Sequence, residues 1–108
     1  MKSPQRGEVW LVDLGLAAKI RPCLVISVPA ADEDRALVTV VPHTTSLRGT
    51  RYEIFVPTRF LRSGGFDAQG IVTVPTVRLM RPLGALSSGQ IKDVMSGVCL
   101  WLGINEAP

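Results

Sequence analysis

The sequence has few of the residues that build metal or redox sites. Its two cysteines, Cys23 and Cys99, lie far apart and lack the short paired spacings of a zinc site. We expect both thiols to be reduced and buried, and a single disulfide between them is the alternative. His43 is the only histidine, and aromatic residues make up 6% of the chain. The sequence therefore predicts no bound metal and no cofactor.

Long apolar runs and an apolar leader are also missing. Proline or charge interrupts every apolar stretch well short of the ~20 residues that cross a bilayer. The chain begins Met1-Lys2-Ser3-Pro4, without an apolar signal core. We therefore expect a soluble, unprocessed, cytoplasmic protein that does not bind membranes. Its 108 residues, of which 46% are hydrophobic, suit one core, which predicts a single domain over residues 1–108.

Charge is modest but unevenly distributed. The formal net charge is +3, and residues 43–62 hold four arginines against the single acid Glu53. This local surplus equals the net charge of the whole chain. The planar guanidinium of arginine suits phosphate well. A polyanion is therefore one candidate partner, and an ordinary basic surface is the alternative.

Short β-rich runs dominate the first 80 residues. Residues 58–62 are expected to form one helical turn, residues 63–65 are expected to break the pattern, and Pro75 marks an edge or a bulge. The predicted strands cover residues 8–14, 21–28, 36–41, 52–56, 71–74 and 76–80.

The period changes after Gly84, where apolar residues recur at helical spacing. Ser87 and Gln90 have the form of a capping box, and Gly103 stands at the expected C-cap. Trp101 is expected to cover the same core, or with Leu100 to form a second contact surface. The apolar stripe consists of Ile91, Val94, Met95, Val98 and Leu102. Together these elements predict a mainly β fold, a small SH3-like antiparallel β-barrel with a C-terminal α-helix.

Three segments with recognisable sequences follow one another along the chain. They are residues 6–14 (RGEVWLVDL), 21–27 (RPCLVIS) and 40–45 (VVPHTT). In this order and spacing the chain resembles the MazF/PemK family of bacterial toxin–antitoxin toxins. The resemblance extends to Arg78 in a late strand and to a helix after Leu86-Ser87. It implies an SH3-like barrel that forms a homodimer, cleaves single-stranded RNA without a metal, and is silenced by a cognate antitoxin whose tail fills the RNA groove.

The resemblance also assigns roles to residues. Cleaving RNA through its own 2′-OH needs a proton acceptor, a cation for the phosphorane and a proton donor for the 5′ oxygen. Arg21, at the family's arginine-proline position, matches the cation, and Thr44 matches the hydroxyl that binds the scissile phosphate. The alternatives are that Arg21 pairs with a surface carboxylate such as Asp13, and that Thr44 satisfies its own turn.

Further residues are candidates for binding RNA. Thr45 occupies the neighbouring serine-like position, and Lys19 is the only charge in the short linker of residues 15–20. Arg48 and Arg51 lie in the basic segment. Arg78 matches the arginine of the family's late strand, although it is also typical of a surface residue.

The chain departs from the family pattern at one important place. The family commonly has Asp-Gln-(apolar)-Arg where this chain has Pro75-Thr76-Val77-Arg78, so the acidic candidate for general base is missing. His43, whose ordinary pKa lies near 6.5, is the remaining candidate for proton transfer. A structural role at a strand end is its alternative.

These features predict a metal-independent, sequence-selective endoribonuclease toxin that leaves a cyclic phosphate and a 5′-OH. The main alternative is a noncatalytic barrel that binds RNA or a partner after losing the catalytic acid. A purely structural dimer subunit is a third hypothesis.

Overall fold

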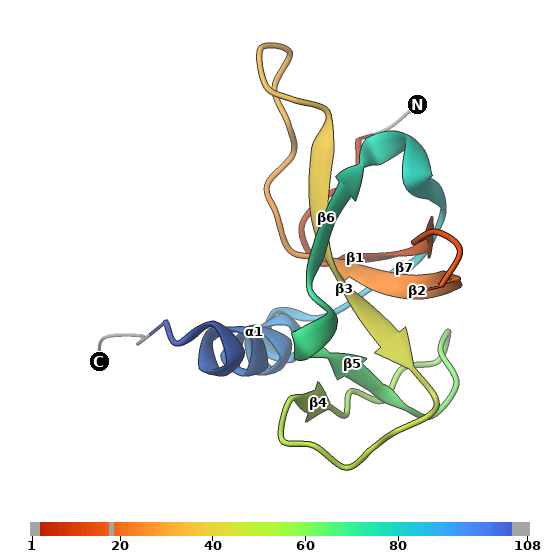
Figure 1. Cartoon of the computed structure of the whole chain (residues 1–108), viewed down its shortest axis with the longest axis vertical. Coiled ribbons are helices and arrows are strands. Elements are labelled where there is room, and N and C mark those ends of the chain that lie inside the picture. Colours follow the sequence, from red (N-terminus) through yellow and green to blue (C-terminus); the bar gives the residue numbers. More distant parts are fainter. Residues whose placement is uncertain (1–2, 18, 105–108) are drawn as a thin grey trace.

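The chain folds into a bent antiparallel sheet with one long helix at its side. Figure 1 shows the computed structural model, which describes residues 3–17 and 19–104. The strands are β1 (Glu8–Asp13), β2 (Ile20–Val25), β3 (Leu37–Thr44), β4 (Glu53–Ile54), β5 (Gly65–Asp67), β6 (Val72–Pro75) and β7 (Leu79–Ala85). The helix is α1 (Ser88–Leu102), and two short 3-10 turns are η1 (Ala68–Gly70) and η2 (Thr76–Arg78).

The sheet has the strand order β4-β5-β3-β2-β1-β7, and β6 also pairs with β3. All the pairings are antiparallel. Within the described residues, β7 pairs with β1 and no pairing joins it to β6, so the sheet does not close into a ring. The predicted class, a mainly β antiparallel fold with a C-terminal helix, is confirmed.

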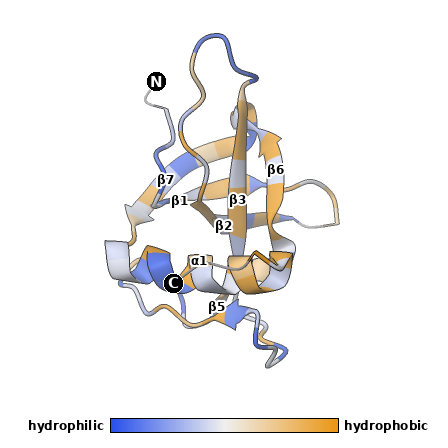
Figure 2. Cartoon of the chain, turned by 90° about the vertical axis from the view of Figure 1, so that its left-hand side faces the viewer, coloured by the Kyte–Doolittle hydropathy of each residue, from blue (hydrophilic) through white to orange (hydrophobic). Residues whose placement is uncertain are grey.

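Both faces of the central strands are buried, because the bend of the sheet creates two apolar clusters. Adjacent residues in a strand point to opposite faces, and in β2 Leu24 packs in the helix-side cluster whereas Cys23 and Val25 pack in the other. Phe66, Val94 and Val98 join the helix-side cluster. This pattern explains why apolar residues stand next to one another in β2, at Cys23, Leu24 and Val25, and in β3, at Val40 and Val41. Figure 2 shows the hydropathy along the chain.

The helix begins and ends where its caps predict. Ser87 and Gln90 form both bonds of the capping box, and Gly103 adopts the left-handed conformation with φ of 69°. The inner part of the predicted stripe is buried, but Leu102 is exposed. Trp101 stacks edge-on against Tyr52 with 5.3 Å between ring centroids, and 42% of it remains exposed. Cys23 and Cys99 are not joined by a disulfide, as expected, but only Cys23 is fully buried, and Cys99 is partly buried.

Three local predictions were wrong. Residues 58–62 bend without forming a helical turn. Strand β5 begins at Gly65, inside the expected break, because Gly64 and Gly65 let it approach β3 and β4 closely. Residues 76–78 form η2, where a strand was expected, and β7 instead continues to Ala85 with irregular pairing around Trp10.

The described part of the chain contains no helix long and apolar enough to span a membrane.

Candidate active site

Four strand ends lie side by side at one end of the sheet. In the order β3-β2-β1-β7, strand β3 ends at Thr44, β2 begins at Ile20, β1 ends at Asp13 and β7 begins at Leu79. Because neighbouring strands are antiparallel, these four ends coincide. Val12 pairs with Arg21 on one side and with Leu79 on the other. Residues far apart in the sequence are thus assembled along one edge.

The β2–β3 register brings Arg21 toward Thr44. The paired residues are Cys23–Pro42, Leu24–Val41 and Val25–Val40. Continuing this ladder by two residues places Arg21 opposite Thr44, and directly opposed residues share a face of the sheet. Burial raises the pKa of the neighbouring Cys23 thiol to about 12, and the Arg21 charge acts to lower it. Arg21 and Cys23 are two residues apart in β2, so they share a face of the sheet, and this is also the face of Thr44 in this register.

The Thr44 hydroxyl lies at the start of the loop after β3. Its oxygen accepts a hydrogen bond from the Ser46 backbone N–H at 3.1 Å, which is the turn contact considered from the sequence. Accepting this bond fixes the side chain and leaves the hydroxyl proton for donation. Thr45 follows directly and is exposed.

Asp13 supplies a carboxylate at the same edge. Its Oδ2 lies 3.8 Å from Arg78 Nη1, and its Oδ1 accepts a hydrogen bond from Gly15 N at 3.0 Å. Both charged side chains are about half exposed. The sequence suggested Asp13 only as a partner of Arg21. The position of Asp13 at the end of the first predicted strand could have marked it as a site residue. That Arg78 is its neighbour could be known only from the order of the strands.

Lys19 adds a positive charge to this end. It has a φ of 64°, and its backbone closes the β1–β2 hairpin through bonds to Gly15 and Leu14. The side chain is exposed. Lys19, Arg21 and Arg78 therefore all lie at one end of the sheet with Thr44.

The structure places Arg48 and Arg51 differently. The backbone N–H of Arg48 binds the Glu53 carboxylate, and this bond with that of Thr50 lowers the pKa of Glu53. The Arg51 guanidinium donates to the Tyr52 hydroxyl at 2.8 Å. Tyr52 in turn contacts Trp101 near the end of α1. Figure 1 shows the loop between β3 and β4 running toward the helix. These contacts place Arg51 beside the end of α1.

His43 lies on the opposite face of β3 from Thr44, because strand neighbours alternate. It pairs with Phe66, only 4% of it is exposed, and its ring meets the Phe66 ring edge-on at 5.0 Å. Burial lowers the pKa of His43 below its ordinary 6.5. This is the environment of a neutral structural histidine.

The burial of His43 predicts a specific pH dependence of stability. Because the pKa of His43 is lower in the folded chain, the unfolded chain binds more protons at this histidine below about pH 6.5. The free energy of unfolding therefore decreases as the pH falls, by at most about 1.4 kcal/mol per pH unit. Urea unfolding between pH 7.5 and 5.5 should show this loss in the wild type and not in His43→Asn. An unchanged pH slope in the variant would show that His43 is not the group responsible.

Within residues 3–17 and 19–104, no group of three or more His, Cys, Asp or Glu side chains is arranged to hold a metal ion. The available chemistry at this end is that of cations, hydroxyls and one carboxylate, which suits a phosphodiester.

Comparison with known proteins agrees with this architecture. The family model described as PemK-like, MazF-like toxin of type II toxin-antitoxin system matches residues 5–102. An endoribonuclease from a mycobacterial species is similar in structure, with TM-score 0.79 and 25% identity, over 100% of this chain and 98% of that one. MazE–MazF from Deinococcus radiodurans has TM-score 0.81 and 21% identity, over 97% and 100%. The chain therefore belongs to the PemK-like, MazF-like family of toxins from type II toxin–antitoxin systems.

Proposed function

We propose that this chain is a toxin endoribonuclease that cuts single-stranded RNA without a metal, by attack of the RNA's own 2′-OH. The observation that supports this most is the arrangement at one sheet end, where the β2–β3 register, continued by two residues beyond Cys23–Pro42, sets Arg21 opposite Thr44, and the Asp13–Arg78 pair lies at the end of the neighbouring strand β1. The similar mycobacterial protein is an endoribonuclease, which agrees with that chemistry.

In this mechanism the 2′ oxygen attacks phosphorus, the 5′ oxygen leaves, and a cyclic phosphate with a 5′-OH results. The Arg21 guanidinium stabilises the extra negative charge of the phosphorane with its fork of N–H donors. The Thr44 hydroxyl donates to a phosphoryl oxygen. Lys19, Thr45 and Arg78 bind the adjoining phosphates, with Arg48 and Arg51 as outer contacts for a longer RNA.

The sequence lacks the acidic residue that the family pattern offers as the proton acceptor. The carboxylate of Asp13 lies at the same sheet end as Arg21 and is half exposed. His43 was the candidate from the sequence, but it is buried on the other face of β3. Strand alternation puts the Asp13 side chain on the face opposite to Arg21, since Asp13 pairs with Ile20 and Val12 pairs with Arg21. Of the two candidates Asp13 is the exposed one and lies at the sheet edge, and on this ground we propose it as the group that accepts the 2′-OH proton.

We further propose that the protein acts in the cytoplasm as a homodimer and that a cognate antitoxin silences it. A similar mycobacterial endoribonuclease is known in complex with its cognate antitoxin, with TM-score 0.79 and 24% identity. An acidic antitoxin tail is complementary to Lys19, Arg21 and Arg78, and would block RNA by covering the same charges.

Removing either central group should abolish cleavage. We expect Arg21→Ala and Thr44→Ala each to slow cutting of an unstructured RNA in excess chelator about a hundredfold or more, because each loses a donor to the transition state. Matched controls are Arg35→Ala and Thr73→Ala, which remove the same groups elsewhere. Rates come from end-labelled RNA on gels, and circular dichroism checks folding. Full activity in either variant would remove that residue from the mechanism.

The same assay tests the noncatalytic alternative. Tight, salt-sensitive retention of varied RNAs with no strand scission would favour a binding barrel over an enzyme. The family membership and the endoribonuclease among similar structures do not favour this alternative.

Replacing the carboxylate should identify the proton acceptor. Asp13→Asn keeps the oxygen that accepts the Gly15 hydrogen bond but loses basicity, so we expect cleavage to fall about 10²–10⁴-fold. Asp93→Asn on the exposed face of α1 is the matched control, and His43→Asn should retain most activity at pH 8. The opposite result, with Asp13→Asn active and a folded His43→Asn inactive, would assign the proton transfer to His43.

A further inference from the structure

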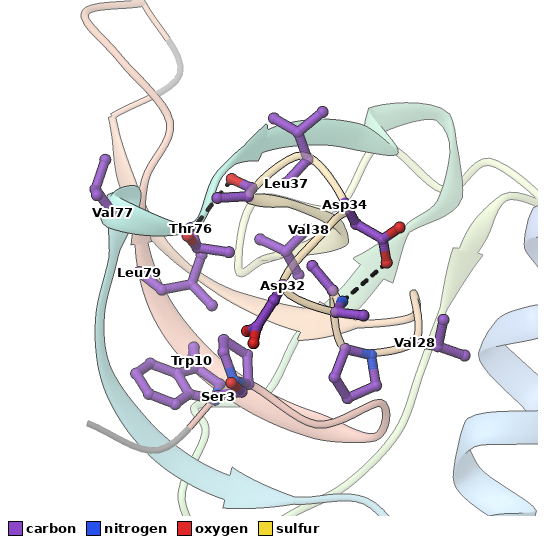
Figure 3. A pocket seen from close by; sticks show the side chains of 15 residues that line it. Ser3, Trp10, Val28, Asp32, Asp34, Leu37, Val38, Thr76, Val77 and Leu79 are labelled. Atoms are coloured by element: carbon purple, nitrogen blue, oxygen red, sulfur yellow. Dashed lines mark hydrogen bonds between the residues drawn. The ribbon is translucent and has the colours of Figure 1, made fainter.

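A cavity of about 580 Å³ lies at the other end of β3 from Thr44. Figure 3 shows it between the loop that follows β2 and the turn η2. Trp10, Val38 and Leu79 are among its lining residues and belong to three different strands. Its volume is within the range of about 300–1,000 Å³ typical of ligand sites. None of the side chains proposed to act on RNA lines it, although its lining residues Val77 and Leu79 flank Arg78 in the sequence.

The charge of this cavity is opposite to that of the active site. Among its lining residues the only formal charges are the carboxylates of Asp32 and Asp34. Asp34 is engaged within the loop, where its Oδ2 accepts a hydrogen bond from Ala31 N at 2.8 Å. Asp32 points toward Trp10 (Figure 3). Carboxylates at the opening of the cavity and apolar residues inside it disfavour a polyanion. They favour a ligand that combines a positive charge with an apolar group.

The apolar surface continues beyond the cavity itself. Val77 and Val28 line its rim and are 87% and 75% exposed. A small molecule inside the cavity would leave both rims in water, whereas a stretch of polypeptide crossing the mouth would cover them. Val28 and Val77 lie on opposite sides of the cavity (Figure 3), so a segment that covers both must cross it.

We propose that this cavity is the docking site for a segment of a partner protein that inserts an apolar side chain toward Trp10 and places a lysine or arginine against Asp32. This inference goes beyond RNA cleavage and does not depend on it. The required segment is basic, so it differs from the acidic tail expected at Arg21.

Chemical-shift mapping on the full chain tests the proposal. The probe is the capped hexapeptide acetyl-GKLLRG-amide, compared with acidic acetyl-GELLEG-amide and polar acetyl-GKSSRG-amide. We expect only the basic apolar peptide to shift the indole N–H of Trp10 and the amides of Val38 and Val77, in a saturable way. An equal response to all three peptides, or none to the basic one, would overturn the proposal.

A charge reversal gives the matched test. Asp32→Lys should no longer bind the basic peptide and should bind the acidic one. Glu33→Lys, in the same loop but outside the cavity lining, should keep the wild-type preference for the basic peptide. If both variants change the preference equally, the effect is one of net charge and the docking site is wrong. RNA cleavage is measured separately, so failure here leaves the proposed enzyme activity untouched.

Discussion

The backbone ladder between β2 and β3 is the interaction on which the candidate site depends. It sets Cys23 against Pro42 and Val25 against Val40, and its continuation sets Arg21 against Thr44. Because side chains alternate along a strand, a slip of one residue would put His43 on the face of Arg21 and Thr44 on the other. The residues buried on both faces of these strands resist such a slip, since it would exchange side chains between two close-packed apolar clusters.

Two further features hold the strand ends in place. A Cβ atom at Gly64 would overlap the Thr44 carbonyl oxygen, so glycine there lets the segment leading into β5 pack against the end of β3. The Asp13–Arg78 pair is half exposed at 3.8 Å, and such a pair adds little stability. Its significance is positional, because it keeps a carboxylate and a guanidinium at the edge where β2 begins.

Short sequence patterns correctly predicted those features that depend on neighbouring residues in the chain. The strands near Val9 and Leu24 and both helix caps follow from alternation and capping residues. The family resemblance pointed to Arg21 and Thr44. Strand β5 was missed because the glycines that let it lie close to its neighbouring strands are, in the sequence, typical of a break between elements. The Asp13–Arg78 pair and the face of His43 depend on strand order and register, which no short segment specifies.

The central claim is that Arg21 and Thr44 act together on one phosphodiester. A double-mutant cycle measures this directly, using single-turnover cleavage rates of the wild type, Arg21→Ala, Thr44→Ala and the double variant. When two groups stabilise the same transition state, removing the second adds little to the rate loss caused by removing the first. Groups that act independently give losses of activation free energy that add. We predict that the double variant cleaves about as slowly as the slower single variant. Fully additive free-energy losses would contradict the claim that the two side chains converge on one phosphate.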